Sequence, residues 1–232
     1  MKSGYGQFCP VAVASEIFAE RWTPIILREL VLGSRRFNDI HRGVPRLSRA
    51  LLARRLRQLQ AAGVVESNGR DYGLTRSGEE LGEIVVRLGE WGQRWTQPVQ
   101  RARLDPRLLM WDMRRRIALE RLPEKRVVVR FDFRGVPAAP RLPKAFWLLM
   151  EKPEVDLCII DPGHEPDLFV DADLASFSKV WLGAVPIRQA IRDGDIRVSG
   201  ERQLARDFPS GLLLSTLAPV PRPGEDNQRR AA

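Results

Sequence analysis

Cysteine and histidine are scarce in this sequence, with two residues of each type among 232. Two cysteines, Cys9 and Cys158, are too few for the disulfide framework of small secreted domains. The histidines, His41 and His164, stand in different halves of the chain, so neither a histidine-based metal site nor a Ser-His-Asp set within one domain is supported. No phosphate-binding loop or dinucleotide fingerprint is present. We expect no enzyme activity, no cofactor and no metal.

Long apolar runs are absent as well. No stretch approaches the roughly 20 consecutive apolar residues that a membrane helix needs. Residues 1–9 lack the apolar core and cleavage pattern of a secretory signal. Hydrophobic residues make up 44% of the chain and charged residues 29%, a balance typical of globular proteins. We expect a cytoplasmic protein with no membrane partner, long enough for two domains.

The net charge of +9 is unevenly distributed. Basic side chains outnumber acidic ones in residues 1–100 and again in residues 101–129, whereas acidic side chains are in excess in residues 130–219. The basic excess therefore indicates a polyanionic partner for the N-terminal half. A basic surface that serves solubility explains the same distribution, so charge alone leaves both interpretations open.

The N-terminal half is predicted to consist of helices, a hairpin and a final long helix. Apolar spacing and turn residues predict helices over 11–20, 23–33, 37–43 and 48–63, strands over 64–67 and 72–75, and a helix from 75 to about 101. Thr23 and Ser48 are the candidate N-caps. The Asn68-Gly69 pair between the two strands favours a two-residue type I′ turn.

The helix predicted to begin at Ser48 has two different sides. Leu52, Leu56 and Leu59 recur at i, i+4 and i+7, which places them on one stripe. At 100° per residue, the side away from this stripe carries Arg49, Ala50, Ala53, Arg54 and Arg57. Arginine offers forked donors that match guanine or phosphate, and a helix with small side chains fits a major groove about 12 Å wide. A helical bundle with a charged outer face is the alternative.

Further arginines surround this helix. Eight arginines and one acidic residue lie between Gly33 and Gly63. Those that precede a helix are placed where phosphate contacts commonly position such a module, and Arg70 at the hairpin tip can reach a backbone or a minor groove. The residues that we predict to contact double-stranded DNA are Arg36, Arg46, Ser48, Arg49, Ala50, Ala53, Arg54, Arg57 and Arg70.

Ordered motifs fill the segment from about Phe8 to Trp95: Cys9-Pro10-Val11, Arg21-Trp22-Thr23, Arg36-Phe37-Asn38-Asp39-Ile40, Leu47-Ser48, Ala62-Gly63-Val64-Val65 and Tyr72-Gly73-Leu74-Thr75. With these motifs the segment resembles the HxlR-type winged helix-turn-helix regulators of bacteria. The resemblance implies a homodimer formed by the first and last helices, a recognition helix over 48–61 and a wing over 67–72. The wing is short and Ala50, Ala53 and Arg54 depart from the family's usual residues, so the operator cannot be transferred.

The same resemblance implies that Cys9 acts as a redox or electrophile sensor. A reactive thiol needs a lowered pKa, which a nearby arginine or helix N-terminus can provide. An unreactive thiol in the dimer contact is the alternative. Cys158, within an apolar run, is expected to be a buried small hydrophobic residue.

The C-terminal half is predicted to be α+β. The predicted elements are strands over 127–133, 146–150, 155–160, 168–170 and 196–199, and helices over 108–122, 174–181, 187–192 and from 204 onward. The proposed division is a DNA-binding and dimerisation domain over 1–101, a linker or helix over 102–125, an α+β domain over 126–219 and a disordered tail over 220–232.

The motifs Val170-Asp171-Ala172-Asp173-Leu174, Trp181-Leu182-Gly183 and Gly194-Asp195-Ile196-Arg197-Val198-Ser199-Gly200 give the C-terminal half its own resemblance. It is similar to sterol-carrier-protein-2-like domains, which are mixed sheets covered by helices. The resemblance implies a fatty-acyl or sterol-like ligand. Aromatic residues that could line its pocket, or simply form core, are Trp111, Phe146, Trp147, Phe177 and Trp181.

The sequence thus favours a sequence-specific, dimeric DNA-binding transcription regulator, a repressor, whose C-terminal domain binds a small apolar effector. A lipid or acyl carrier that uses the N-terminal module only for dimerisation is the second interpretation. In a third, the C-terminal half is purely a structural interaction domain. The sequence specifies neither the operator nor the effector.

Overall fold

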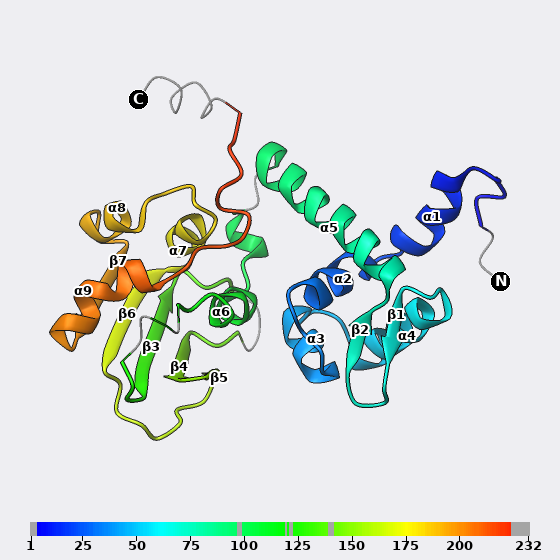
Figure 1. The fold of residues 1–232 in the computed structure, drawn as a ribbon. Helices are drawn as coiled ribbons and strands as arrows, with labels where there is room; N and C mark the ends of the chain where they lie inside the picture. Colours follow the sequence, from blue (N-terminus) through cyan, green and yellow to red (C-terminus); the bar gives the residue numbers. More distant parts are fainter. Residues whose placement is uncertain (1–3, 97–98, 119, 121–122, 139–141, 224–232) are drawn as a thin grey trace. The chain divides into compact units, whose positions relative to one another are not determined.

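The computed structural model describes residues 4–96, 99–118, 120, 123–138 and 142–223. The chain divides into two compact units, Met1–Trp91 and Gly92–Ala232, which are described separately below (Figure 1). Of the tail predicted over 220–232, residues 224–232 lie outside the described part. In the described part, no helix combines the length and the apolar character needed to cross a membrane.

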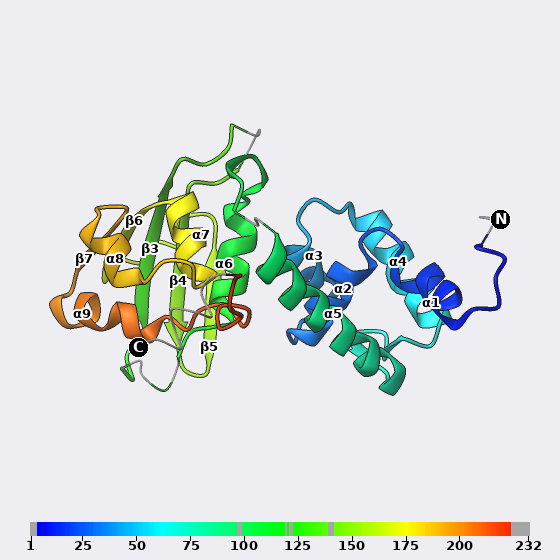
Figure 2. The ribbon, with the colours of Figure 1, turned by 90° about the horizontal axis from the view of Figure 1, so that it is seen from above.

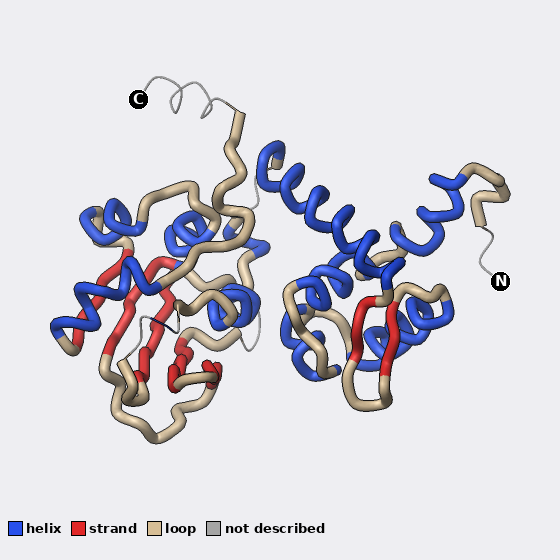
Figure 3. The backbone as a smooth tube through the Cα atoms, in the orientation of Figure 1, coloured by secondary structure: helices blue, strands red, loops and turns tan. Residues whose placement is uncertain are grey.

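The first unit contains helices and one hairpin (Figure 3). Its elements are α1 (Pro10–Phe18), α2 (Thr23–Val31), α3 (Phe37–Gly43), α4 (Arg49–Ala61), β1 (Val65–Ser67), β2 (Tyr72–Leu74) and α5 (Arg76–Trp95), whose last turn falls in the second unit. β1 and β2 are antiparallel, with Glu66 opposite Gly73. This order is a winged helix-turn-helix fold, so the predicted fold class is confirmed.

Burial of leucines fixes the rotation of α4 about its own axis. Leu52, Leu56 and Leu59 are each at most 2% exposed and pack in the core with Ile26 and Ile40 of the preceding helices. Ser48 is the N-cap, because its side-chain oxygen accepts a hydrogen bond from the Leu51 N–H at 3.3 Å. Both features agree with the sequence pattern.

Two predicted turn features are wrong. Thr23 does not cap α2: it is the first helical residue and is buried, and the cap position is taken by Trp22 with φ of 80°. The hairpin turn is not a two-residue type I′ turn, since Asn68 does not have a positive φ. Instead, the Asn68 side-chain oxygen accepts hydrogen bonds from the N–H groups of Arg70 and Asp71, which makes a longer loop over residues 68–71.

A fully buried carboxylate joins α2 to α3. Glu29 is 0% exposed. One oxygen accepts a hydrogen bond from Arg28 at 2.7 Å, and the other accepts one from the Ser34 hydroxyl at 3.1 Å. Arg28 also donates to the Gly43 carbonyl at the end of α3. A Cβ at Gly43 would overlap the Glu29 carboxylate, so glycine is required where the two helices meet.

The second unit is built on a five-stranded mixed sheet. Its elements are a short 3-10 helix (Arg101–Arg103), α6 (Pro106–Arg114), β3 (Val127–Arg134), β4 (Ala145–Glu151), β5 (Glu154–Cys158), β6 (Leu168–Asp173), α7 (Leu174–Trp181), α8 (Ile187–Arg192), β7 (Ile196–Gly200) and α9 (Arg202–Gly211). The strand order is β5-β4-β3-β6-β7. β3 and β6 are parallel and the other neighbours are antiparallel, as predicted for a mixed sheet.

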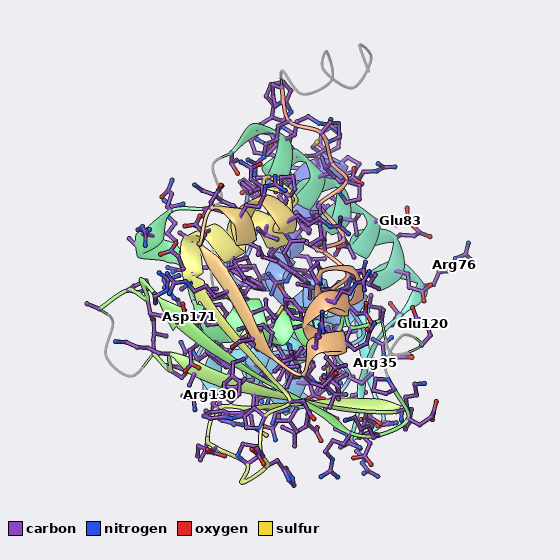
Figure 4. All side chains as sticks on the ribbon, turned by 90° about the vertical axis from the view of Figure 1, so that its left-hand side faces the viewer. Arg35, Arg76, Glu83, Glu120, Arg130 and Asp171 are labelled. Carbon is purple, nitrogen blue, oxygen red and sulfur yellow. The ribbon has the colours of Figure 1, made fainter. Side chains whose placement is uncertain are left out.

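One face of this sheet holds the core. Alternate β3 residues Val129, Phe131 and Phe133 are buried in one cluster with side chains from α6, α7 and α8, and α9 packs against the same cluster. Figures 1 and 2 show these helices gathered on that face. The intervening residues belong to the opposite face, which includes Arg130 and Asp171, labelled in Figure 4.

The helix predicted over 108–122 is wrong beyond Arg114, where α6 ends. Instead, Ile117 forms a β-bridge with Leu212, and the Arg116 guanidinium donates to the Leu214 carbonyl at 3.0 Å. The Arg114 guanidinium donates to the Val155 carbonyl at 2.6 Å. These contacts with distant residues replace a continued helix after Arg114, and the local sequence does not reveal them. Residues 119, 121 and 122 lie outside the described part.

We predict that Gly43→Ala destabilises the first unit, because the added methyl group overlaps the buried Glu29 carboxylate. Overpacking of this kind lowers the free energy of unfolding by about 1–3 kcal/mol. Urea denaturation followed by circular dichroism measures the change. Gly73→Ala is the matched control, since its Cβ would meet only the Glu66 side chain, at 3.6 Å. Equal stability of both variants would contradict the role of Gly43.

Candidate functional site

The side of α4 that faces away from its leucines is open to solvent. Arg54 and Arg57 are exposed, as are Ser48, Arg49 and Ala50 at the start of the helix, and Ala53 is half-buried. Within the described residues, the Arg54 and Arg57 side chains have no hydrogen bond or ion pair, so both guanidinium groups have all their donors available. The six predicted positions on this helix thus lie on one accessible side.

Arg49 differs from these two arginines because the protein holds it in place. Its guanidinium donates to the Asn38 side-chain oxygen of α3 at 2.8 Å and lies over the Phe37 ring, 6.0 Å from the ring centroid. These contacts with an aromatic ring and an amide already restrict the rotamers of Arg49. The Arg49 side chain therefore loses less conformational entropy when it binds a partner. The open side of α4 therefore combines one arginine held by neighbouring side chains with two that make no such contact among the described residues.

Arg55 lies on the opposite side of the same helix, among the leucines. It is 6% exposed and donates to Glu20, which follows α1, at 2.8 Å and to Gln58 at 2.8 Å. Its Nε is buried without a hydrogen-bond partner among the described residues. Arg55 follows Leu52 by three residues, so helical spacing places it on the leucine side, but its partner Glu20 is 35 residues away along the chain and no local pattern indicates it.

The wing and the loops next to α4 carry the remaining predicted contacts. Arg70 is exposed in the loop between β1 and β2, and Arg36 and Arg46 are exposed before α3 and α4. The Arg36 backbone forms a bridge with Asp71, which ties the wing loop to the start of α3. All three arginines are accessible. The acidic Asp71 in the wing loop reduces the positive charge there.

Large apolar side chains remain exposed on two helices of the first unit. On α5, Ile84 is 54% exposed, Leu88 46% and Trp91 57%, and their i, i+4, i+7 spacing makes one stripe. On α1, Val11 is 73% and Val13 50% exposed. Apolar stripes of this kind mark surfaces that another apolar surface covers.

The second unit contains a largely apolar, partly open cavity of about 690 Å³ between the sheet and α9. Its apolar lining includes Val127, Val129, Phe131, Leu148, Leu204 and Phe208. None of the described α9 residues is fully buried, because the apolar side of this helix faces the cavity. The volume lies within the roughly 300–1,000 Å³ of ligand sites.

The five aromatic residues predicted for a ligand pocket are not among those that line this cavity. Phe146 and Phe177 are 0% exposed and pack edge-on to Phe133 in the core. The guanidinium groups of Arg114 and Arg115 both lie over the Trp111 ring, 4.8 and 5.0 Å from its centroid. Trp147 lies under Arg130 on the helix-free face of the sheet, and Trp181 is in α7. The lining residues Val127, Val129 and Phe131 could have been found from the alternation of β3, but not the void beside them.

The two cysteines occupy different environments. Cys9 is exposed and immediately precedes α1, whereas Cys158 is half-buried at the end of β5. Burial, together with the charge of Asp156, raises the pKa of the Cys158 thiol. No group of three or more His, Cys, Asp or Glu side chains within the described residues is arranged to hold a metal ion.

Known proteins similar to this chain fall into two groups. An uncharacterized HTH-type transcriptional regulator of Bacillus subtilis, YvaP, is 32% identical over 100 residues, which make up 40% of this chain and 93% of the relative. The crystal structure of quinone-bound YodB from B. subtilis is 30% identical and covers 36% of this chain and 97% of YodB, with a TM-score of 0.34. A solved UbiJ-SCP2 ubiquinone synthesis protein is 22% identical and covers 40% of this chain and 69% of its own, with a TM-score of 0.30.

The geometry of the first unit defines a winged helix-turn-helix module in which α4, the second helix of the helix-turn-helix, carries the exposed arginines. The profile of the HxlR-like helix-turn-helix family matches residues 17–100, and the chain belongs to this family.

We predict that Cys9 reacts with a thiol reagent well before Cys158 in the native protein. Cys9 is exposed, while the raised pKa of Cys158 reduces its thiolate fraction near neutral pH and shifts its reactivity to higher pH. Labelling with Ellman's reagent should give two phases that differ in rate by about tenfold or more. Cys9→Ser should remove the fast phase; a fast phase that persists in this variant would contradict the assignment.

Proposed function

We propose that this protein is a sequence-specific DNA-binding transcription regulator that acts as a homodimer and represses its target genes. Residues 1–101 serve DNA binding and dimerisation, and residues 126–219 form a ligand-binding domain. The observation that carries the proposal is the open side of α4, where Arg54 and Arg57 stand unpaired opposite a buried leucine stripe.

Each proposed contact has a separate physical role. Arg54 and Arg57, with the small Ala50 and Ala53 beside them, enter the major groove, where arginine pairs bidentately with guanine or with phosphate. Arg36 and Arg46 bind phosphates and set the position of the module, and Arg70 reaches the backbone or minor groove from the wing. Ser48 and Arg49 lie at the helix N-terminus, where anions are favoured.

The exposed apolar stripe of α5 and the exposed valines of α1 support the dimer. Two copies that bring these helices together cover Ile84, Leu88 and Trp91 and present two recognition helices to one duplex. Cys9, at the start of α1, is proposed as a redox or electrophile sensor at this contact.

A small apolar effector is proposed to bind the cavity of the second unit and to change the affinity for DNA. Such an effector must prefer one of two dimer geometries, because a ligand that binds both equally shifts nothing. The same cavity supports a second candidate function, a lipid or acyl carrier that uses the N-terminal unit only for dimerisation. A measurement of DNA binding distinguishes the regulator from the carrier.

We predict that the Arg54→Ala/Arg57→Ala double variant binds the DNA upstream of its own gene more weakly and with a flatter salt dependence. If each arginine neutralises one phosphate, the slope of log K against log salt falls by about 0.9 for each arginine removed. If either arginine reads a base, the loss is about 1–3 kcal/mol per contact. Fluorescence anisotropy over a range of salt concentrations measures both quantities.

The matched control is Arg188→Ala/Arg192→Ala, which removes the same charge from exposed positions on α8. This control should keep the wild-type slope. An unchanged slope in the α4 variant, or equal changes in both, would contradict the groove assignment. Absence of DNA binding by the wild-type protein would favour the carrier.

We predict that Ile84→Glu or Leu88→Glu converts the dimer to a monomer, because a carboxylate in the proposed contact is buried without a partner. Size-exclusion chromatography with light scattering should show the mass halved. Val86→Glu makes the same kind of change at an exposed position on the other side of α5, about 160° around the helix from Ile84 and Leu88, and should leave the dimer intact. A wild-type monomer, or a dimer unaffected by either stripe variant, would contradict the proposed interface.

A further inference from the structure

The cavity under α9 has an apolar interior and a polar rim. Val127, Val129 and Phe131 are successive inward-facing residues of β3, so this wall runs about 13 Å along the strand. The lining residues that are exposed to solvent, and therefore form the rim, are Lys125, Glu201, Gln203, Asp207 and Ser210. A ligand in this cavity would place its apolar part along β3 and its polar end at the rim.

The N–H groups at the rim that could bind an anion already donate hydrogen bonds to acidic side chains of the rim. The N–H groups of Gln203 and Leu204, at the N-terminus of α9, both donate to the Glu201 carboxylate, at 2.9 Å each. These two hydrogen bonds lower the pKa of Glu201 and keep it ionised. A ligand carboxylate at this helix terminus would have to displace Glu201.

The Gln203 side-chain amide and the Lys125 ammonium group, two further donors at the rim, also lie beside carboxylates. The Gln203 side-chain amide donates to the Asp207 carboxylate at 2.6 Å. Lys125, the cation among the described rim residues, lies 3.8 Å from Asp167, so a neighbouring acid offsets its charge. Arg202 and Arg206 of the same helix are exposed and do not line the cavity. Among the described rim residues, two carboxylates, Glu201 and Asp207, therefore stand against one cation, Lys125.

From this arrangement we infer that the cavity takes an amphiphile with a cationic, hydrogen-bond-donating end, an amine in its ammonium form, which Glu201 and Asp207 bind at the rim. The inference rests on the ligand-binding part of the proposed function. It disfavours amphiphiles that end in a carboxylate, because such an end would bring a third anion to Glu201 and Asp207 and would find the N–H donors there already engaged. The attraction is between exposed charges and is therefore weakened by salt.

Three probes with the same dodecyl chain test the inference: dodecylammonium, dodecanol and dodecanoate, each below its micellar concentration. Binding to the full-length protein is measured by displacement of a fluorescent apolar dye. Dodecylammonium should bind about tenfold more tightly than dodecanoate, with dodecanol between them, and added salt should narrow the difference. Equal affinities, tighter binding of dodecanoate, or no binding by any probe would overturn the inference.

Variants at the rim test the residues. Glu201→Gln/Asp207→Asn should remove the preference for dodecylammonium and leave dodecanol binding unchanged, whereas Glu165→Gln/Asp193→Asn, an equal change of charge at exposed positions off the cavity, should keep the preference. Asp207→Lys should reverse the preference toward dodecanoate, a result that a misfolded protein cannot give. Persistence of the preference in the rim variants would overturn the assignment.

The two proposals fail independently. Loss of end-group preference leaves the salt-dependent DNA titration unaffected. Absence of DNA binding, in turn, leaves the comparison of the three probes intact.

Discussion

The helix-turn-helix depends on one buried negative charge. Glu29 is fully enclosed, and a carboxylate in that position is tolerated because Arg28 and Ser34 supply its hydrogen bonds. Removing one partner of a buried pair typically costs about 3–5 kcal/mol, since the other charge is left uncompensated. The same network reaches the carbonyl of Gly43, where α3 ends. Polar contacts therefore join α2 to α3 in addition to their apolar packing, and α4 begins after the loop that follows α3.

Part of this architecture is readable from the sequence because it is periodic. Leu52, Leu56 and Leu59 identify the buried side of α4, and that alone predicts which side Arg54 and Arg57 take. The wing follows from two short strands around Asn68-Gly69. The positive φ of Trp22, the partner of Glu29 and the ion pair of Arg55 could not be predicted, because each depends on residues brought together only by the fold.

In the second unit, the sequence predicts a strand over 127–133 within an α+β domain, and the structure confirms a mixed sheet with helices on one face. The sequence left open whether the five aromatic residues line a pocket or form core, and Phe146 and Phe177 fill the core. The cavity lies instead where α9 stands off the sheet, beside smaller residues such as Val127. A void is a property of the distance between elements, and no residue pattern encodes that distance directly.

The ion pair between Arg55 and Glu20 has a mechanical consequence. Glu20 comes two residues after the end of α1, and Arg55 sits in mid-α4 next to Arg54. If α1 is displaced by more than the reach of this contact, α4 must move with it or a guanidinium is stranded in apolar surroundings without its counter-charge. A displacement of α1 therefore either breaks this ion pair or shifts the arginine-bearing helix, and the second outcome needs no change in the residues that face outward.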